Sequence, residues 1–274
     1  MVLIDEGKCT GCGSCVKICH QHCLELAGGK VRLEQAICST CTQCIAACPE
    51  RALSWDGVPS APFAPENLPS PEQLEELFGE RRSVRDFRPE PLPRALLERI
   101  VASGALAPTN NYALRAVITD DTEVVRDLDR AVVRFAGMLY RLFFRPQPVF
   151  ALLRALTPGM TATDRVKMEA GVTRGQNFRT FPAAMVFVTG DRRTALSLES
   201  AQCALANMYF TAQVLGVASC LFGPGRIMLD RSRSARRRLG LGGHEHILGT
   251  LLLGWPAVRF RNRVRGKDLP LRWV

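Results

Sequence analysis

The chain of 274 residues is 47% hydrophobic and 23% charged, which is typical of a folded globular protein and excludes a disordered one. Its formal net charge of +10 points to an anionic partner or cofactor. The longest apolar stretch, residues 135–156, is interrupted by Arg141, Arg145 and Pro146, so we predict no membrane span.

The first residues, MVLIDEGKCT, lack the basic segment and the apolar run of a secretory signal. We therefore expect a cytoplasmic protein. In such a reducing compartment, the 11 cysteines of the chain are expected to bind metal and not to form disulfides.

Eight of the cysteines form an internal repeat. The segments CTGCGSCVKIC (9–19) and CSTCTQCIAAC (38–48) have the same cysteine spacing and lie 29 residues apart. A short apolar segment suited to a strand follows each of them, LELA at 24–27 and ALSW at 52–55. Zinc sites usually combine two C-x2-C pairs, or cysteine with histidine, across a longer loop. Three cysteines at this spacing followed by a fourth, present twice, favour iron–sulfur clusters over a zinc ribbon.

This passage resembles the bacterial two-cluster ferredoxins, in which the fourth cysteine of each run ligates the other cluster. The resemblance implies two [4Fe–4S] clusters. One would be held by Cys9, Cys12, Cys15 and Cys48, and the other by Cys38, Cys41, Cys44 and Cys19. Pro49 follows Cys48 as in that family, whereas His20 follows Cys19. We interpret Cys23 as a spare thiol in the small core.

A proline-rich segment, DGVPSAPFAPENLPSPEQ (56–73), separates the cysteine-rich part from the rest and favours an extended linker. We predict a ferredoxin-like domain at 1–57, a linker at 58–70 and a larger domain at 71–274. Residues 1–57 contain five basic and six acidic residues, a net charge of −1, so the remaining residues carry +11. No zinc finger, recognition helix or aromatic-rich basic strand accompanies this charge, and we predict no nucleic-acid partner.

The larger domain begins with a basic cluster at a helix-to-loop junction. PEQLEELFGER (71–81) is predicted to form a helix that ends near Gly79, and a second predicted helix has Pro93 at its start. Guanidinium groups and a hydroxyl suit a phosphate, although surface ion pairs use the same residue types. The residues between the two helices that offer such groups are Arg81, Arg82, Ser83 and Arg85.

The order of the segments over residues 71–274 resembles the nitroreductase family. The arginine cluster, a helix and APTNN (107–111) come first. A buried strand at 181–191 follows, then a long helix, a strand and a glycine loop within 197–225, and a last strand with a basic tail at 246–274. The likeness is to the branch that fuses a two-cluster ferredoxin to the nitroreductase domain. It implies an α+β fold, with a small ferredoxin-like domain ahead of an FMN-binding sandwich, and a homodimer.

The resemblance also implies which residues contact FMN. Arg81, Arg82 and Ser83 would surround the phosphate, and Arg85 would lie near the pyrimidine edge, where positive charge stabilises reduced flavin. We name no catalytic side chain, because the flavin carries out the chemistry in this family. The further candidates are Thr109, Asn110 and Asn111 at the flavin edge, Gly223 near N5, and Arg263, Arg265 and Lys267, which fit an exposed basic tail equally well.

The sequence therefore predicts an FMN-dependent oxidoreductase. Low-potential electrons from ferredoxin or a similar donor would enter through the clusters, and a small electron-poor substrate such as a nitro compound, a quinone or an activated alkene would be reduced. The opposite direction, in which a substrate is oxidised and electrons leave through the clusters, stays open. A non-catalytic electron-transfer module without flavin is a third alternative, suggested by the shortened APTNNYALR segment (107–115), which lacks the family's Gln-Pro.

Overall fold

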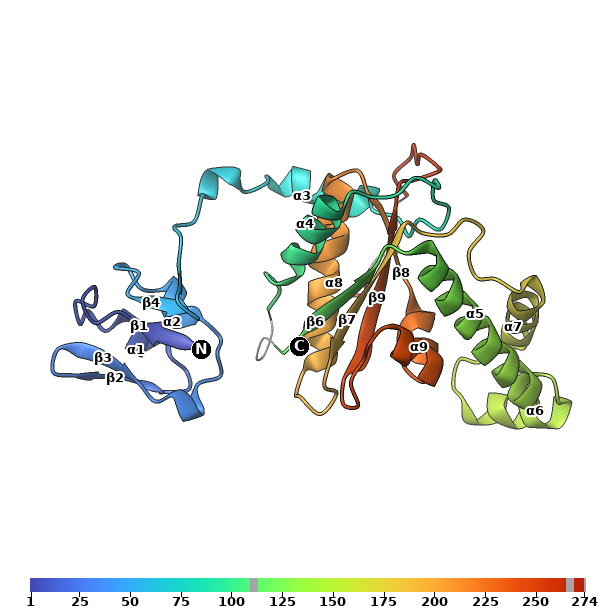
Figure 1. The fold of residues 1–274 in the computed structure, drawn as a ribbon, viewed down its shortest axis with the longest axis horizontal. Helices are drawn as coiled ribbons and strands as arrows, with labels where there is room; N and C mark the ends of the chain where they lie inside the picture. The colour runs from blue at the N-terminus through green and yellow to red at the C-terminus, as the bar shows by residue number, and fades with distance from the viewer. Residues whose placement is uncertain (109–112, 265–268, 274) are drawn as a thin grey trace. The chain divides into compact units, whose positions relative to one another are not determined.

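The computed structural model of the chain describes residues 1–108, 113–264 and 269–273. Its contacts divide the chain into two compact units with a boundary between Ser70 and Pro71. The first unit comprises Met1–Ser70, and the second comprises Pro71–Pro108 and Leu114–Val274. Each unit has its own β-structure and its own buried core (Figure 1).

The first unit is built from small antiparallel sheets and short helices. β1 (Val2–Ile4), β4 (Leu53–Trp55) and β5 (Val58–Pro59) form one sheet in the order β1-β4-β5, and β2 (Leu24–Ala27) pairs with β3 (Lys30–Leu33) in a hairpin. The helices are α1 (Ser14–Ile18) and α2 (Gln43–Ala46), and a 3₁₀ turn spans Gln35–Ile37. Each cysteine segment thus leads into a short helix and then into a strand, as the repeat predicts.

The backbone of the two cysteine loops repeats as the sequence does. Gly11 and Gly13 have left-handed φ angles of 71° and 76°, and Thr40 and Thr42, at the equivalent positions of the second loop, have 55° and 60°. Left-handed backbone costs a residue with a side chain about 1–2 kcal/mol, and it is unusual for a β-branched residue. The second loop therefore adopts the conformation of the first against the preference of its threonines.

The second unit contains a four-stranded antiparallel sheet. Its strands are β6 (Arg115–Thr119), β7 (Ala184–Gly190), β8 (Ala218–Leu221) and β9 (His246–Gly254), in the order β6-β7-β9-β8. All residues of β7 and all but the first of β9 are buried, because both faces of these central strands are covered. β7 and β9 thus form the centre of the unit, and β8 lies at an edge.

Helices cover both faces of this sheet (Figure 1). α4 (Arg94–Gly104) and α8 (Ser197–Val214) cover one face, where Ile100 and Leu205 are buried. α5 (Thr122–Leu139), a π-helical turn at Gly225–Leu229 and α9 (Arg233–Arg238) cover the other face, where Leu128 and Phe187 are buried. Both units therefore combine helices and strands, as predicted.

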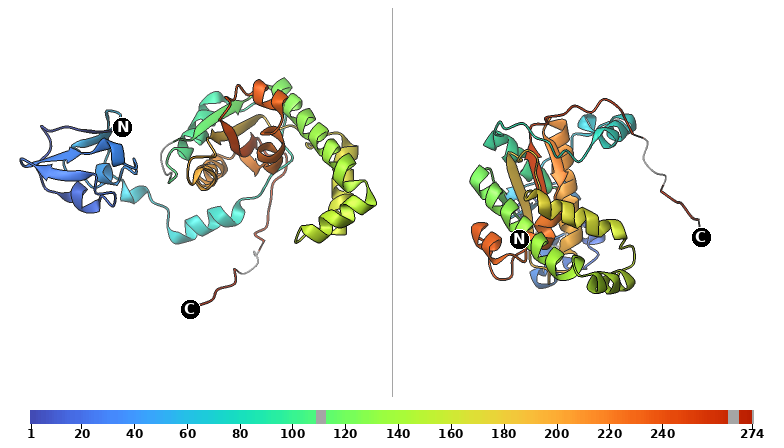
Figure 2. Two further views of the ribbon diagram at one scale, coloured as in Figure 1. Left: turned by 90° about the horizontal axis from the view of Figure 1, so that it is seen from below. Right: turned by 90° about the vertical axis from the view of Figure 1, so that its right-hand side faces the viewer.

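Residues 135–156 form helices and not a membrane span. α5 continues into a π-helical turn at Tyr140–Phe144, and α6 (Gln147–Leu156) begins after Pro146, with α7 (Ala162–Arg174) following. This group of helices extends away from the sheet (Figure 2). In the part of the chain that the structure describes, no helix combines the length and the apolarity that crossing a bilayer requires.

α3 (Pro71–Glu80) opens the second unit. Its Phe78 packs against Phe210 of α8, with ring centroids 4.9 Å apart. Residues 61–70, which precede it, are exposed and contain a 3₁₀ turn at Pro65–Asn67. α3 ends immediately before the arginine cluster, so its contact with α8 fixes where that cluster begins.

Candidate functional site

The first cysteine-lined cavity takes residues from both halves of the repeat. Its lining includes Cys9, Cys12 and Cys15 from the first run and Cys48 from the second. Burial raises the pKa of the Cys15 thiol, and the neighbouring Cys48 and Cys12 thiols add to the rise. The structure thus brings together the four cysteines that the ferredoxin resemblance assigns to one cluster.

The second cavity has the complementary set. Cys38, Cys41 and Cys44 line it together with Cys19 from the first run, and Cys23 lines it as well. Burial raises the pKa of the Cys44 thiol to about 11, and the Cys41 and Cys38 thiols contribute to that rise. Each cavity therefore receives three thiols from one run and the fourth from the other.

The thiols of each set surround a space and do not converge on a point. Among the residues that the structure describes, no three Cys, His, Asp or Glu side chains are grouped closely enough to hold a single metal ion. A [4Fe–4S] cluster instead bonds one thiolate to each of its four irons. Four cysteines around one cavity fit such a cluster, and iron takes a buried thiol in its deprotonated form.

Gly11 makes a close backbone contact beside the first cavity. A Cβ at this position would collide with the carbonyl oxygen of Gly29, whereas a Cβ at Gly29, with a similar left-handed φ of 75°, would meet open space. The Lys30 ammonium donates to the carbonyl oxygens of Glu6, at 2.8 Å, and Cys9, at 2.5 Å. The turn between β2 and β3 is therefore fixed against the first cysteine loop.

The predicted arginine cluster of the second unit lies beside the edge strand β8. The N–H of Val84 donates to the carbonyl of Ser219 at 3.0 Å and so aligns this loop with the strand. Burial raises the pKa of the Cys220 thiol on the same strand, and the Arg85 charge and the Ser83 hydroxyl oppose that rise. The loop thus places a guanidinium and a hydroxyl beside the end of β8.

The guanidinium groups of the cluster have different partners. Arg82 donates to two carbonyl oxygens at the C-terminal end of α3, at 2.7 and 2.8 Å, and so caps that helix. Arg81 lies over an aromatic ring of α8, 5.5 Å from the ring centroid, and its charge also reaches Cys220. Arg85 is exposed, and its hydrogen bond to the carbonyl of Ser83 is long, at 3.4 Å. Arg85 is therefore the member of the cluster held least firmly by its own chain.

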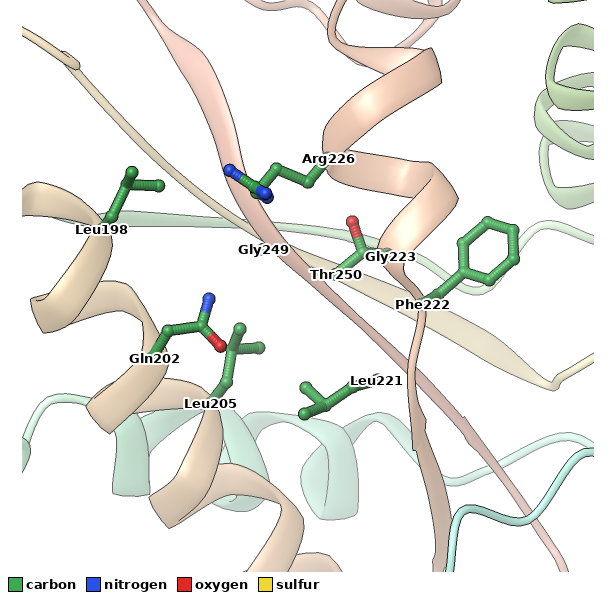
Figure 3. A pocket seen from close by; sticks show the side chains of 9 residues that line it. All are labelled: Leu198, Gln202, Leu205, Leu221, Phe222, Gly223, Arg226, Gly249 and Thr250. Carbon is green, nitrogen blue, oxygen red and sulfur yellow. The ribbon is translucent and has the colours of Figure 1, made fainter. Parts of the chain in front are cut away.

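A pocket opens where β8 ends (Figure 3). Its volume of about 370 Å³ lies at the lower end of the range of small-molecule sites. Gly223, the predicted donor to flavin N5, is part of its wall. The other lining residues are Leu198, Gln202 and Leu205 of α8, Leu221, Phe222 and Arg226 at and after the end of β8, and Gly249 and Thr250 of β9.

Three polar residues of this pocket were not predicted from the sequence. The Gln202 and Arg226 side chains extend into the same space from opposite sides (Figure 3). Thr250 is 2% exposed, and its hydroxyl has no hydrogen-bond partner among residues 1–108, 113–264 and 269–273. An unpaired buried hydroxyl costs about 1–3 kcal/mol, so a polar group bound beside it would be stabilised. Of the three, only Arg226 lies next to a segment that the sequence analysis singled out, the glycine loop that ends in GPG.

Asp230 anchors the segment that leads from the pocket to α9. Its side chain is 4% exposed and accepts a hydrogen bond from the N–H of Ile247 at 2.8 Å. It also pairs with Arg192 at 3.0 Å, with Arg236 at 3.2 Å and with Nδ1 of His246 at 3.1 Å. One buried carboxylate therefore holds the π-helical turn against β9, α9 and the segment after β7.

The remaining predicted FMN contacts lie in the C-terminal tail and in the APTNN motif. Arg263 donates to the Glu76 carboxylate at 3.2 Å and to the carbonyl of Glu75 at 3.3 Å, and it packs against Gly79. The Arg263 side chain thus packs against α3. The predicted contacts that lie outside the described residues are Thr109, Asn110, Asn111, Arg265 and Lys267.

Comparison with known families matches most of the chain. The profile of the nitroreductase family matches residues 79–255, which include the arginine cluster, β8 and the pocket. The chain belongs to the nitroreductase family. A 4Fe-4S binding domain profile matches residues 1–21, which contain the first cysteine run. The predicted fusion of a ferredoxin-type segment to a nitroreductase domain is confirmed.

Solved structures show the same fold. A nitroreductase with bound FMN from Bacteroides fragilis NCTC 9343 is 19% identical with a TM-score of 0.53, over 73% of this chain and 98% of that one. A nitroreductase with bound FMN from Desulfitobacterium hafniense DCB-2 is 19% identical with a TM-score of 0.55, over 73% of this chain and 97% of that one. Oxidised iodotyrosine deiodinase bound to FMN and 3-iodo-L-tyrosine is 18% identical with a TM-score of 0.51, over 73% and 98%. The predicted α+β fold is confirmed. Curated protein sequences gave no significant match.

We expect Gly11→Ala to reduce the iron content of the protein, because the new Cβ meets the Gly29 carbonyl and distorts the first cysteine loop. Gly29→Ala is the matched control: it carries the same left-handed strain of about 1–2 kcal/mol, without a collision. Iron per chain after anaerobic purification should be lower in Gly11→Ala than in Gly29→Ala. Equal iron contents would show that the close contact does not shape the loop.

Proposed function

We propose that the chain is an FMN-dependent oxidoreductase that receives electrons through two [4Fe–4S] clusters and reduces a small electron-poor substrate, such as a nitro compound, a quinone or an activated alkene. One observation carries the proposal: two cavities, each lined by three cysteines of one run and the fourth of the other, occur in the same chain as a nitroreductase domain. Such clusters transfer single electrons and have no substrate site of their own. The substrate would therefore bind in the second unit.

The grouping of thiols supports the assignment of the cluster ligands. One cluster takes Cys9, Cys12, Cys15 and Cys48, which share a cavity. The shared left-handed backbone of the two cysteine loops supports a second cluster built in the same way. The ligands proposed for it are Cys38, Cys41, Cys44 and Cys19.

The residues of the second unit fit FMN, the cofactor bound in the related structures named above. A phosphate needs cationic and hydroxyl donors, and the loop beside β8 offers Arg81 and Ser83, with Arg82 at the end of α3. A flavin ring needs apolar walls with few polar groups, which the pocket at Gly223 provides. When bound, FMN accepts electrons singly and delivers them in pairs to a substrate. Thr109, Asn110, Asn111, Arg265 and Lys267 stay candidates for further contacts.

The charges of the chain would favour the reduced cofactor and an anionic substrate. Arg85 would place its guanidinium near the pyrimidine edge, where reduced flavin carries negative charge. Its exposure and its weak tie to Ser83 leave it available for this role. Arg226 and the unpaired Thr250 hydroxyl would orient a polar group of the substrate or cofactor in the pocket. The net charge of +11 outside residues 1–57 supports anion binding.

We also propose that the chain works as a homodimer, in a reducing compartment such as the cytoplasm, with ferredoxin or a similar low-potential protein as its electron donor. Large apolar side chains in the C-terminal tail are exposed in the single chain, among them Leu269 at 91% and Trp273 at 88%. Exposed apolar surface of this kind supports burial by a second chain. All 11 cysteines are free thiols, as a reducing compartment requires.

The cofactor content of the protein tests the proposed function. After anaerobic purification, we expect about eight iron atoms, about eight sulfides and about one FMN per chain. Iron without flavin would contradict the flavoenzyme and favour the electron-transfer module. Flavin with only about four iron atoms would contradict the second cluster.

We expect Arg85→Ala to weaken FMN binding roughly ten-fold or more, about 1.4 kcal/mol, because a charge-assisted contact is lost. The midpoint potential of the flavin should also fall, since the reduced, anionic form loses more stabilisation than the oxidised form. Arg99→Ala, which removes an exposed arginine from α4, is the control. Fluorescence titration of the apoprotein with FMN and a redox titration measure the two effects. Unchanged affinity and potential in Arg85→Ala would exclude the proposed contact.

A further inference from the structure

The second cysteine-lined cavity contains one thiol more than a cluster needs. Cys19, Cys38, Cys41 and Cys44 line it together with Cys23. Cys23 is 5% exposed, and its sulfur lies 3.3 Å from the sulfur of Cys19. The described lining of the first cavity has four cysteines. Two thiols thus stand at a single corner of the second cavity.

A tight turn brings Cys23 back to Cys19. The N–H of His22 donates to the carbonyl of Cys19 at 3.1 Å, and His22 has a left-handed φ of 52°. The carbonyl of Cys23 then accepts the N–H of Glu34 at 2.8 Å, next to the hairpin of β2 and β3. Backbone hydrogen bonds on both sides of the turn therefore fix the positions from which the two sulfurs reach the cavity.

The internal repeat supplies a comparison within the same molecule. The positions 29 residues after Cys19 and Cys23 are Cys48 and Ala52. The turn residue Arg51 has a φ of 51°, close to that of its counterpart in the first half. Ala52 is 2% exposed, and its N–H donates to the Cys48 sulfur at 3.3 Å. The same turn thus places Ala52, which has no thiol, next to Cys48 in the second half of the repeat, and a thiol next to Cys19 in the first half.

We propose that Cys23 is an alternative ligand of the second cluster and can replace Cys19 at one iron. This inference rests on the two clusters of the proposed function. In the exchange, the bond from iron to the Cys19 sulfur breaks, and a bond from the same iron to the Cys23 sulfur forms. The proton of the Cys23 thiol passes to Cys19, and no electron is gained or lost. The 3.3 Å contact lets the proton pass directly between the sulfurs.

This arrangement makes the two clusters unequal. The second cluster has a substitute for its fourth ligand, because Cys23 lines the same cavity as Cys19. The first cluster has no such substitute at the equivalent position, where Ala52 stands. Loss of the fourth thiol is therefore tolerated by the second cluster and not by the first.

Matched removal of the fourth thiols tests the proposal. Cys19→Ala should retain the iron content of the wild type and the electron paramagnetic resonance signals of both reduced clusters. Cys48→Ala should lose iron from the first cluster. The double variant Cys19→Ala/Cys23→Ala should lose iron from the second cluster. Equal iron loss in the two single variants would overturn the proposal, and so would an insoluble Cys19→Ala beside a soluble Cys48→Ala.

Chelation of the holoprotein decides the case even if both single variants fail to fold. A ferrous chelator added anaerobically should remove the second cluster several-fold faster from Cys23→Ala than from the wild type, because a released iron corner has no second thiol to recapture it. Cys203→Ala, which removes a thiol from α8 of the second unit, is the matched control and should keep the wild-type rate. Equal rates in Cys23→Ala and the wild type would overturn the proposal.

The iron content of the wild type separates this inference from the proposed function. About four iron atoms per chain in the wild type would refute the second cluster itself. About eight iron atoms, with equal losses in Cys19→Ala and Cys48→Ala, would leave the proposed function intact and refute only the role of Cys23.

Discussion

The fold of the first unit depends on the cysteine thiols in its core. The buried core formed around Val2 and Leu53 includes Cys9, Cys15, Cys23 and Cys44. A unit as small as Met1–Ser70 gains only about 3–5 kcal/mol from its apolar core, and natural proteins of this size often add cross-links or metal. Bonds from iron to these thiols would therefore hold the fold as well as carry electrons. The left-handed Thr40 and Thr42 fit this view, because strained backbone persists where the surrounding structure requires it.

The second unit depends on a different constraint, the position of β8 at the edge of a buried sheet. β7 and β9 are covered on both faces, and of the two only β9 reaches the pocket, through Gly249 and Thr250. β8 has a free side, along which the arginine loop is aligned by the Val84–Ser219 hydrogen bond, and the pocket opens where this strand ends. Asp230 then fixes the segment that follows. A rigid centre with a functional edge is the common arrangement in sheets that carry sites on their loops.

The sequence predicted the features that depend on short-range pattern. The resemblance of the cysteine runs to two-cluster ferredoxins implied the two sets of thiols. Apolar periodicity predicted the helices that the structure has at 71–80 and 94–104, and the buried strand predicted at 181–191 is observed at 184–190. The pocket was beyond such reasoning, because Gln202, Arg226 and Thr250 come from three elements and share no motif. Their meeting is set by the packing of α8 on β9, which only the tertiary structure shows.

The contacts that single residues of the predicted sites make within the chain were also beyond the sequence. Arg82 was predicted beside a phosphate, and the structure shows its guanidinium on the carbonyl oxygens that end α3. Arg263 was predicted in the tail near the cofactor, and the structure pairs it with Glu76. Cys23 was interpreted as a spare core thiol; it is buried, but it also touches Cys19 in a cavity. Each outcome depends on hydrogen-bond geometry, which spacing along the chain does not encode.

Electron transfer from the clusters to FMN is the step that would couple the first unit to the chemistry of the second. Stopped-flow spectroscopy tests this step most directly. Oxidised protein with FMN bound is mixed anaerobically with reduced ferredoxin, and the cluster and flavin absorbances are followed together. We predict that the clusters are reduced first, that the flavin follows, and that flavin reduction is much slower in Cys48→Ala loaded with the same amount of FMN. Flavin reduction at the wild-type rate in that variant would contradict a path through the clusters.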